Sequence, residues 1–253
     1  MKFYACVLIL LSCISCQIKA QENISVCTDD DDWFPYVYLK SSNSHHVEGI
    51  VISLTDGIFA QLGFKAHYHA LPWLRCMEQL RKGRMDVVIA GTYTAERAKY
   101  AHFPSDAEKL VNSQYILARD PFVVITHKNN RFIYRGNDAE IPAPIRSQHG
   151  YNITNELTKS GLDIKKYYSN QSALEDLLRS QRGSVLINRM SADNILSEPK
   201  YGNYLHYNST PVKIVPYFIM FSKNSINLSE KQRDTFYNEI KHWRERKKNY
   251  YRY

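Results

Sequence analysis

The sequence is poor in the features that mark metalloenzymes and integral membrane proteins. Two cysteines remain after residue 20, and they form no Cys-x-x-Cys pair; no His/Cys cluster there has the spacing of a zinc site. No His-Glu-x-x-His motif, phosphate-binding loop or Ser-His-Asp arrangement is visible. The apolar run centred on residues 7–11 is too short to cross a bilayer, and no later segment is long enough. These absences predict a protein with no metal, no other cofactor and no membrane-spanning helix.

Residues 1–20 have the pattern of a secretory signal peptide. Lys2 gives a positive start, the apolar run follows, and the small residue Ala20 precedes a cleavage point at Gln21. We therefore expect the remaining chain to be exported to the periplasm.

Lipid anchoring is an alternative outcome of the same segment. The stretches 10–13 and 14–16 each end in a cysteine and resemble lipoprotein processing sites. Ordinary cleavage is favoured because neither stretch has the preferred residues before its cysteine.

The basic charge does not point to nucleic acid. The formal charge is +8, and the segment 1–20 holds two lysines and no acid, so the exported chain carries +6. Much of this charge lies at 241–248, which predicts a solvated face of a terminal helix. Export argues against a nucleic-acid partner, whereas a positive field that attracts anionic ligands stays open.

The apolar pattern predicts two α/β halves. In the first half, strands are expected at 24–27, 65–70 and 85–90, with helices at 50–62 and 72–80 between them. The second half repeats this order of strands and helices, with strands at 122–126, from 145, at 164–168 and at 185–188, and helices at 151–157 and 172–180. A last helix begins after Ser229. Alternating strands and helices indicate parallel sheets.

Residues 71–103 carry a family pattern. An aromatic residue in Leu71–Cys76 is followed by a helix, by Gly83-x-x-Asp86 before an apolar strand, and then by Thr-x-x-Arg and a phenylalanine in Thr94–Phe103. This order resembles the polar-amino-acid family of periplasmic solute-binding proteins, family 3 of the bacterial extracellular binding proteins. Looser matches occur at 33–36, 48–50 and 216–223.

The resemblance implies the type II periplasmic-binding fold. Two α/β lobes, each with sheet order 2-1-3, would be joined by a two-strand hinge with the ligand cleft between them. The chain would divide into the first part of lobe 1 at 21–117, lobe 2 at 118–210, and a return to lobe 1 with the C-terminal helix at 211–253.

The same sheet order bears on the two cysteines that remain after export, Cys27 and Cys76. A right-handed crossover from strand two to strand three carries its helix across strand one, which brings the two cysteines together. The resemblance thus favours a disulfide in an oxidising compartment, and two free buried thiols are the alternative.

The resemblance also implies ligand contacts in lobe 1. Arg97 matches the family arginine that grips a carboxylate, a task that suits the two parallel donors of a guanidinium group. Thr92 matches a hydroxyl that binds the ligand, and Trp33 and Trp73 match aromatic positions that flank it. Further candidates are Ala90 and Gly91 in the turn before Thr92, and Asp29 or Asp30 for a ligand amine.

Lobe 2 departs from the family pattern. Gly150, Tyr151 and Asn152 stand where the family has a Gly-Thr-Thr turn that holds an anion. Asn188 stands near the expected position of an aspartate that binds an amine, and no carboxylate is there. This favours a ligand with an anionic group and no obligatory amine.

These observations predict a monomeric, non-enzymatic binding protein. It would capture an amino acid or related organic acid by hinge closure and present it to an ABC-type permease or a sensor. Two alternatives remain at this point: a secreted dehydratase-like enzyme on the same fold, which needs a carboxyl group as general acid, and a signalling module that transports nothing.

Overall fold

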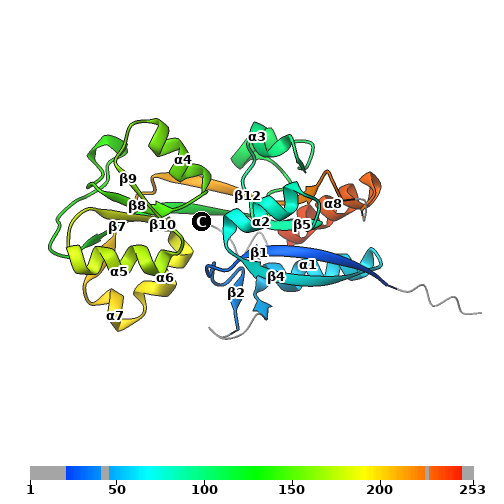
Figure 1. Ribbon diagram of the computed structural model, residues 1–253, viewed down its shortest axis with the longest axis horizontal. Helices are drawn as coiled ribbons and strands as arrows, with labels where there is room; N and C mark the ends of the chain where they lie inside the picture. The colour runs from blue at the N-terminus through cyan, green and yellow to red at the C-terminus, as the bar shows by residue number, and fades with distance from the viewer. Residues whose placement is uncertain (1–20, 41–45, 226–227, 247–253) are drawn as a thin grey trace, which may run out of the picture.

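The computed structural model describes residues 21–40, 46–225 and 228–246 (Figure 1). The expected signal peptide, the lipoprotein sites and the last residues of the basic tail lie outside these ranges. In the described part, no helix is long and apolar enough to cross a membrane. No group of three or more His, Cys, Asp or Glu side chains there is placed to hold a metal ion.

The first lobe begins with strand β1 and contains β1 (Glu22–Asp29), β2 (Tyr38–Leu39), β3 (Val47–Glu48), α1 (Ile50–Gln61), β4 (Phe64–Leu71), α2 (Trp73–Arg81), β5 (Val87–Gly91), α3 (Ala95–Ala98), β6 (Ala101–His102) and the 3₁₀ helix η1 (Ala107–Asn112). The second lobe contains β7 (Ala118–His127), the 3₁₀ helix η2 (Asp138–Glu140), β8 (Ile145–Gln148), α4 (Asn152–Lys159), β9 (Ile164–Tyr167), α5 (Asn170–Ser180), β10 (Ser184–Asn188), α6 (Arg189–Leu196), α7 (Pro199–Gly202) and β11 (Leu205–Tyr207). The chain then returns through β12 (Lys213–Ser222) to α8 (Glu230–Arg246).

Both lobes have the expected strand order. In the first, β1 lies between β4 and β5 and is parallel to both. In the second, β8 lies between β9 and β10 and is parallel to both. The 2-1-3 order is therefore confirmed in each lobe. It places the carboxyl ends of the parallel strands of each lobe at one edge, where a ligand site is expected.

Two long antiparallel strands join the lobes (Figure 1). β12 pairs with β7 along Lys213–Tyr217 and then with β5 and β6 along Phe218–Ser222. One strand thus belongs to both sheets, so a bend in β7 and β12 would change the angle between the lobes.

The C-terminal helix closes the core of the first lobe. Apolar residues of α1 and α8 face each other, and the rings of Phe59 and Phe236 lie 4.6 Å apart. Both rings are fully buried. The helix predicted after Ser229 is therefore part of the first lobe, because its apolar face packs on α1.

Cys27 and Cys76 form the disulfide that the topology favoured. Cys27 lies in β1 and Cys76 in α2, with their Cα atoms 5.6 Å apart. Both are fully buried. Because α2 connects β4 to β5 across β1, the crossover itself brings the two side chains into contact.

Candidate ligand-binding site

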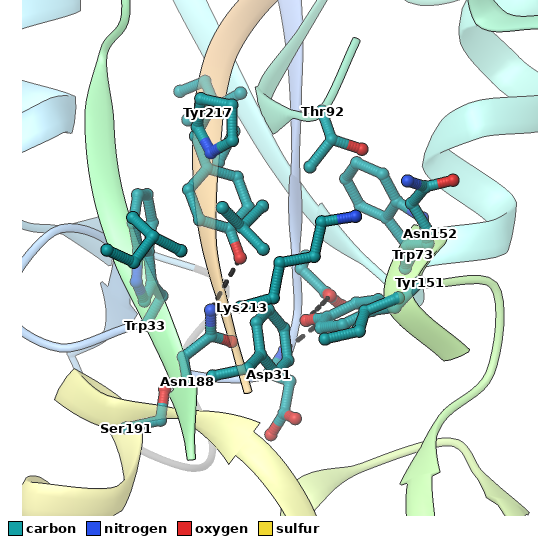
Figure 2. Close-up of a pocket in the computed structure, with 18 of the residues that line it drawn as sticks. Asp31, Trp33, Trp73, Thr92, Tyr151, Asn152, Asn188, Ser191, Lys213 and Tyr217 are labelled. Carbon is teal, nitrogen blue, oxygen red and sulfur yellow. Dashed lines mark hydrogen bonds between the residues drawn. The ribbon is translucent and has the colours of Figure 1, made fainter. Parts of the chain in front are cut away.

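A cavity of about 340 Å³ lies between the lobes. Most of its exposed wall is apolar, and its polar and charged side chains come from both lobes and from β12 (Figure 2). A cavity of this kind, apolar with a few placed polar groups, is typical of small-molecule sites. It is lined by Thr28, Asp29, Asp31, Asp32, Trp33, Val37, Trp73, Ile89, Ala90, Thr92, Tyr93, Arg97, Leu110, Val111, Phe122, Tyr151, Asn152, Ile153, Glu156, Asn170, Asn188, Ser191, Lys213, Ile214, Val215, Pro216 and Tyr217.

Arg97 enters the cavity from the short helix α3. The hydroxyl of Thr94 accepts a hydrogen bond from the Arg97 backbone N–H at 3.1 Å and caps this helix. One guanidinium nitrogen, Nη1, donates to the Thr92 carbonyl at 3.0 Å and to its hydroxyl at 2.5 Å. The guanidinium also lies 5.3 Å from the ring centre of Trp73. The predicted Arg97, Thr92 and Trp73 are thus brought together.

Arg97 has no acidic partner in the described part of the chain. Only 8% of its surface is exposed, and none of the ion pairs between described residues includes it. Burial lowers the pKa of its guanidinium from the ordinary value. A buried cation without a counter-ion is costly, and an anionic ligand would offset that cost.

Of the other residues predicted in lobe 1, Trp33, Ala90 and Asp29 line the cavity, whereas Gly91 and Asp30 do not. Ala90 has a φ of 65°, which is uncommon for a residue with a Cβ atom. Gly91 packs against a neighbouring strand: a Cβ atom there would lie 2.2 Å from the Met220 side chain. Gly91 therefore contributes through close packing of β5 on β12.

In lobe 2, Tyr151, Asn152 and Asn188 line the cavity and Gly150 does not. The Gly150 carbonyl nevertheless faces lobe 1, where it accepts hydrogen bonds from the Trp73 indole at 3.2 Å and from Arg97 Nη2 at 3.4 Å. The Asn188 amide donates to the Tyr217 hydroxyl at 2.6 Å, as Figure 2 shows. Asn188 thus contacts the strand β12 that joins the lobes.

The acidic run after β1 connects the lobes directly. Asp29 accepts hydrogen bonds from the Gln148 amide at 3.0 Å and the Tyr151 hydroxyl at 2.9 Å. Asp31 accepts one from the backbone N–H of Asn170, the first residue of α5, at 2.9 Å. A carboxylate at a helix N-terminus is favoured by the helix dipole. These side chains therefore hold lobe 2 against lobe 1 at the base of the cavity.

Burial raises the pKa of both carboxyl groups. Removal from water is the main cause at Asp29, whose pKa rises well above its ordinary value, and neighbouring Asp31 adds to the rise. At Asp31 burial raises the pKa to about 7, although the Asn170 N–H opposes the shift. Both groups hold a proton at higher pH in the folded state than in the unfolded chain.

Replacing Asp31 with asparagine should reduce the pH dependence of stability. The folded pKa of about 7 exceeds the unfolded value of about 3.9, so Asp31 contributes a free energy of unfolding that falls as pH rises through this window. The difference in free energy of unfolding between the parent and Asp31→Asn should change by up to about 1.4 kcal/mol per pH unit. Urea unfolding at several pH values between 4.5 and 7.5 measures it. Asp163→Asn, at an exposed position, is the control, and equal slopes for parent and Asp31→Asn would contradict the prediction.

Three polar side chains near the cavity, Lys213, Glu156 and Asp120, were not predicted from the sequence. Lys213 forms an ion pair with Glu156, whose other oxygen accepts from the Asn152 amide at 2.8 Å. Asp120 of β7 accepts a hydrogen bond from the Trp33 indole at 2.7 Å. Lys213, Glu156 and Asp120 belong to no local motif, so no sequence signal would have singled them out.

Comparison with known proteins places this architecture in a family. The model of bacterial extracellular solute-binding proteins, family 3, matches residues 24–245. The chain therefore belongs to this family, as the motifs in 71–103 indicated. A search of curated protein sequences found no match.

Solved structures share the fold at low sequence identity. A substrate-binding protein of an amino acid ABC transporter has a TM-score of 0.68 and 19% identity, over 90% of this chain and 95% of its own. A mutant of ArgBP from T. maritima has a TM-score of 0.71 and 18% identity, over 92% and 93%. A histidine kinase sensor domain similar to periplasmic binding proteins has a TM-score of 0.73 and 14% identity, over 91% and 93%. The chain thus has the type II periplasmic-binding fold.

Proposed function

We propose that this protein captures a small carboxylate-bearing solute, an amino acid or a related organic acid, in the cavity between its lobes. The buried guanidinium of Arg97, which has no acidic partner among the described residues, carries this proposal. The Arg97 guanidinium donates hydrogen bonds from Nη1 to Thr92 and lies over the Trp73 ring. These contacts hold the guanidinium in place before a ligand binds. A guanidinium and a carboxylate form parallel charge-assisted hydrogen bonds, which makes a carboxylate the matching ligand group.

Hinge closure is the mechanism that the arrangement supports. The cavity takes lining residues from both lobes, and β7 and β12 connect them. A ligand docked on Arg97 would favour the closed form through contacts with lobe 2 residues such as Tyr151 and Asn152, which an open form would lack.

The exported, ligand-loaded form would then be presented in the periplasm to an ABC-type permease or a sensor. Structures of both kinds of protein share the fold: a substrate-binding protein of a transporter and a sensor domain of a histidine kinase. Pull-down of membrane proteins by the loaded form, followed by identification of the captured partner, separates the two roles.

A thermal-shift panel tests the proposal. Residues 21–253 are heated with amino acids, dicarboxylates and other small acids, each paired with the corresponding carboxamide. A ligand at 100 times its Kd adds about 2.7 kcal/mol to the free energy of unfolding, which raises the midpoint by about 5–10 °C. The acid should raise the midpoint and its amide should not. An equal response to acid and amide, or no response to any acid, would refute the carboxylate clamp.

One observation supports the enzymatic alternative. Asp29 is a half-buried carboxyl group with a raised pKa in the cavity wall, which is what a general acid requires. Chromatography of each acid after prolonged incubation with the protein tests this alternative. Conversion that stops in Asp29→Asn would establish an enzyme, and unchanged ligand would leave binding as the function.

A further inference from the structure

Trp33 forms one side of the cavity and Trp73 lies on the opposite side (Figure 2). Trp33 belongs to the loop after β1 in lobe 1, and 9% of its surface is exposed. Its ring contacts two tyrosines, Tyr36 at a centroid distance of 4.4 Å and Tyr217 at 4.8 Å. Both contacts are tilted, at 34° and 51°. Ring packing of this kind has broad geometric preferences and does not by itself define one orientation of the indole.

A single hydrogen bond supplies the missing constraint. The indole N–H of Trp33 donates to Asp120 Oδ2 at 2.7 Å. Asp120 lies on β7, one of the two strands that join the lobes, and pairs there with Val215 of β12. Because a hydrogen bond is directional, it fixes the direction of the indole edge and hence the plane that faces the cavity.

Asp120 is an expensive group to place at this position. Its side chain has no exposed surface, and its second oxygen, Oδ1, has no hydrogen-bond partner among the described residues. None of the ion pairs in the described part includes it. An apolar residue would fill the same space without this cost, so the carboxyl group is explained by the donors that it faces: the Trp33 indole and the backbone N–H groups of Arg189 and Met190 at the start of α6.

We propose that Asp120 is a positioning residue of the binding site, which fixes the Trp33 indole as a wall of the cavity and ties that wall to the hinge strand β7. The role in ligand selection rests on the function proposed above, whereas the positioning itself does not. A fixed flat wall opposite Trp73 restricts the cavity to ligands whose body fits between two rings. Movement of β7 during hinge closure would also move this wall.

The protonation state of Asp120 provides a readout for the positioning. Burial raises its pKa to about 7, and the Trp33 N–H and the backbone N–H groups of Met190 and Arg189 oppose the rise. The charged or titratable neighbours that act on this carboxyl group are Arg189, at the start of α6, and Tyr217, on β12. Between pH 5 and 9 the acceptor of the indole N–H should therefore change from a carboxylic acid to a carboxylate, which strengthens the hydrogen bond.

The experiment uses ligand-free protein in which Trp73→Phe and Trp243→Phe leave Trp33 as the only tryptophan. Trp33 emission and its near-ultraviolet circular dichroism are recorded from pH 5 to 9. We expect an emission change with a midpoint near 7 that disappears in Asp120→Asn, while the dichroism band stays because an amide oxygen still accepts the N–H. Asp120→Leu should lose most of the dichroism band, because the indole plane is no longer fixed.

Matched variants make the result decisive. Asp31→Asn removes a half-buried carboxyl group of the cavity wall whose pKa is also about 7, and it should leave the emission change in place. Persistence of the change in Asp120→Asn, or its loss in Asp31→Asn instead, would overturn the proposal. So would a full dichroism band in a folded Asp120→Leu protein. If Asp120→Leu does not fold, the emission change in Asp120→Asn still tests the proposal. None of these outcomes depends on which ligand binds.

Discussion

Replacing Arg97 with alanine is expected to abolish the thermal shift that an acidic ligand produces. Removing one partner of a buried, hydrogen-bonded charge pair costs roughly 2–5 kcal/mol, which corresponds to a loss of affinity of about 30-fold or more. Isothermal titration of the strongest acid from the panel measures the loss. Arg97→Lys should give an intermediate result, because lysine keeps the charge and loses the parallel donors.

The stability of the ligand-free Arg97→Ala protein distinguishes a binding role from a structural one. Since Arg97 is buried without an acid among the described residues, its removal relieves a desolvation cost and should leave the unfolding midpoint at or above that of the parent. Lys99→Ala is the matched control. It removes the same charge at the same helix end, where Lys99 is exposed and bonded to Glu96 at 2.5 Å. Equal loss of ligand affinity in Lys99→Ala would show a general field effect and contradict the clamp.

The second large effect is expected from the disulfide. Cys27 and Cys76 are 49 residues apart in sequence, and a loop of that size is worth about 4 kcal/mol in the chain-entropy model. The double variant Cys27→Ala/Cys76→Ala should therefore unfold about 8–16 °C below the parent in a thermal scan.

Thiol counting provides the independent check on this second result. The denatured, unreduced parent, residues 21–253, should show no free thiol, and reductant should lower its midpoint toward that of the double variant. Two reactive thiols in the unreduced protein, or a midpoint that reductant does not change, would contradict the prediction.

Much of the fold follows from local pattern. The period of the apolar residues predicted the strands and helices from 50 to 91, and the structure has them within a few residues of the expected ends. The strands β2 and β3 precede this stretch, and with two residues each they are too short to show a periodic pattern. The family resemblance supplied the sheet order, which periodicity alone does not specify.

The residues of the candidate site also differ in how far the sequence indicated them. Arg97, Thr92 and Trp73 lie in a continuous stretch, so one motif indicated all three, and the structure places them around one end of the cavity. In lobe 2 the pattern is altered, and Tyr151, Asn152 and Asn188 were suggested only by their places relative to the family's Gly-Thr-Thr turn and amine-binding aspartate. Their lining of the cavity depends on how the lobes meet.

The sequence by itself determined the family, the order of the strands and helices, and the cluster of side chains around Arg97, because these depend on neighbours within about thirty residues. Only the tertiary structure decided the rest: that Asp29 and Asp31 hold the two lobes together, that Lys213 pairs with Glu156, and that Asp120 holds Trp33. Asp120 and Trp33 are 87 residues apart, and Asp31 and Asn170 are 139 apart. Hydrogen bonds of this kind are set by the packing of whole lobes, and a single sequence carries no local signal for them.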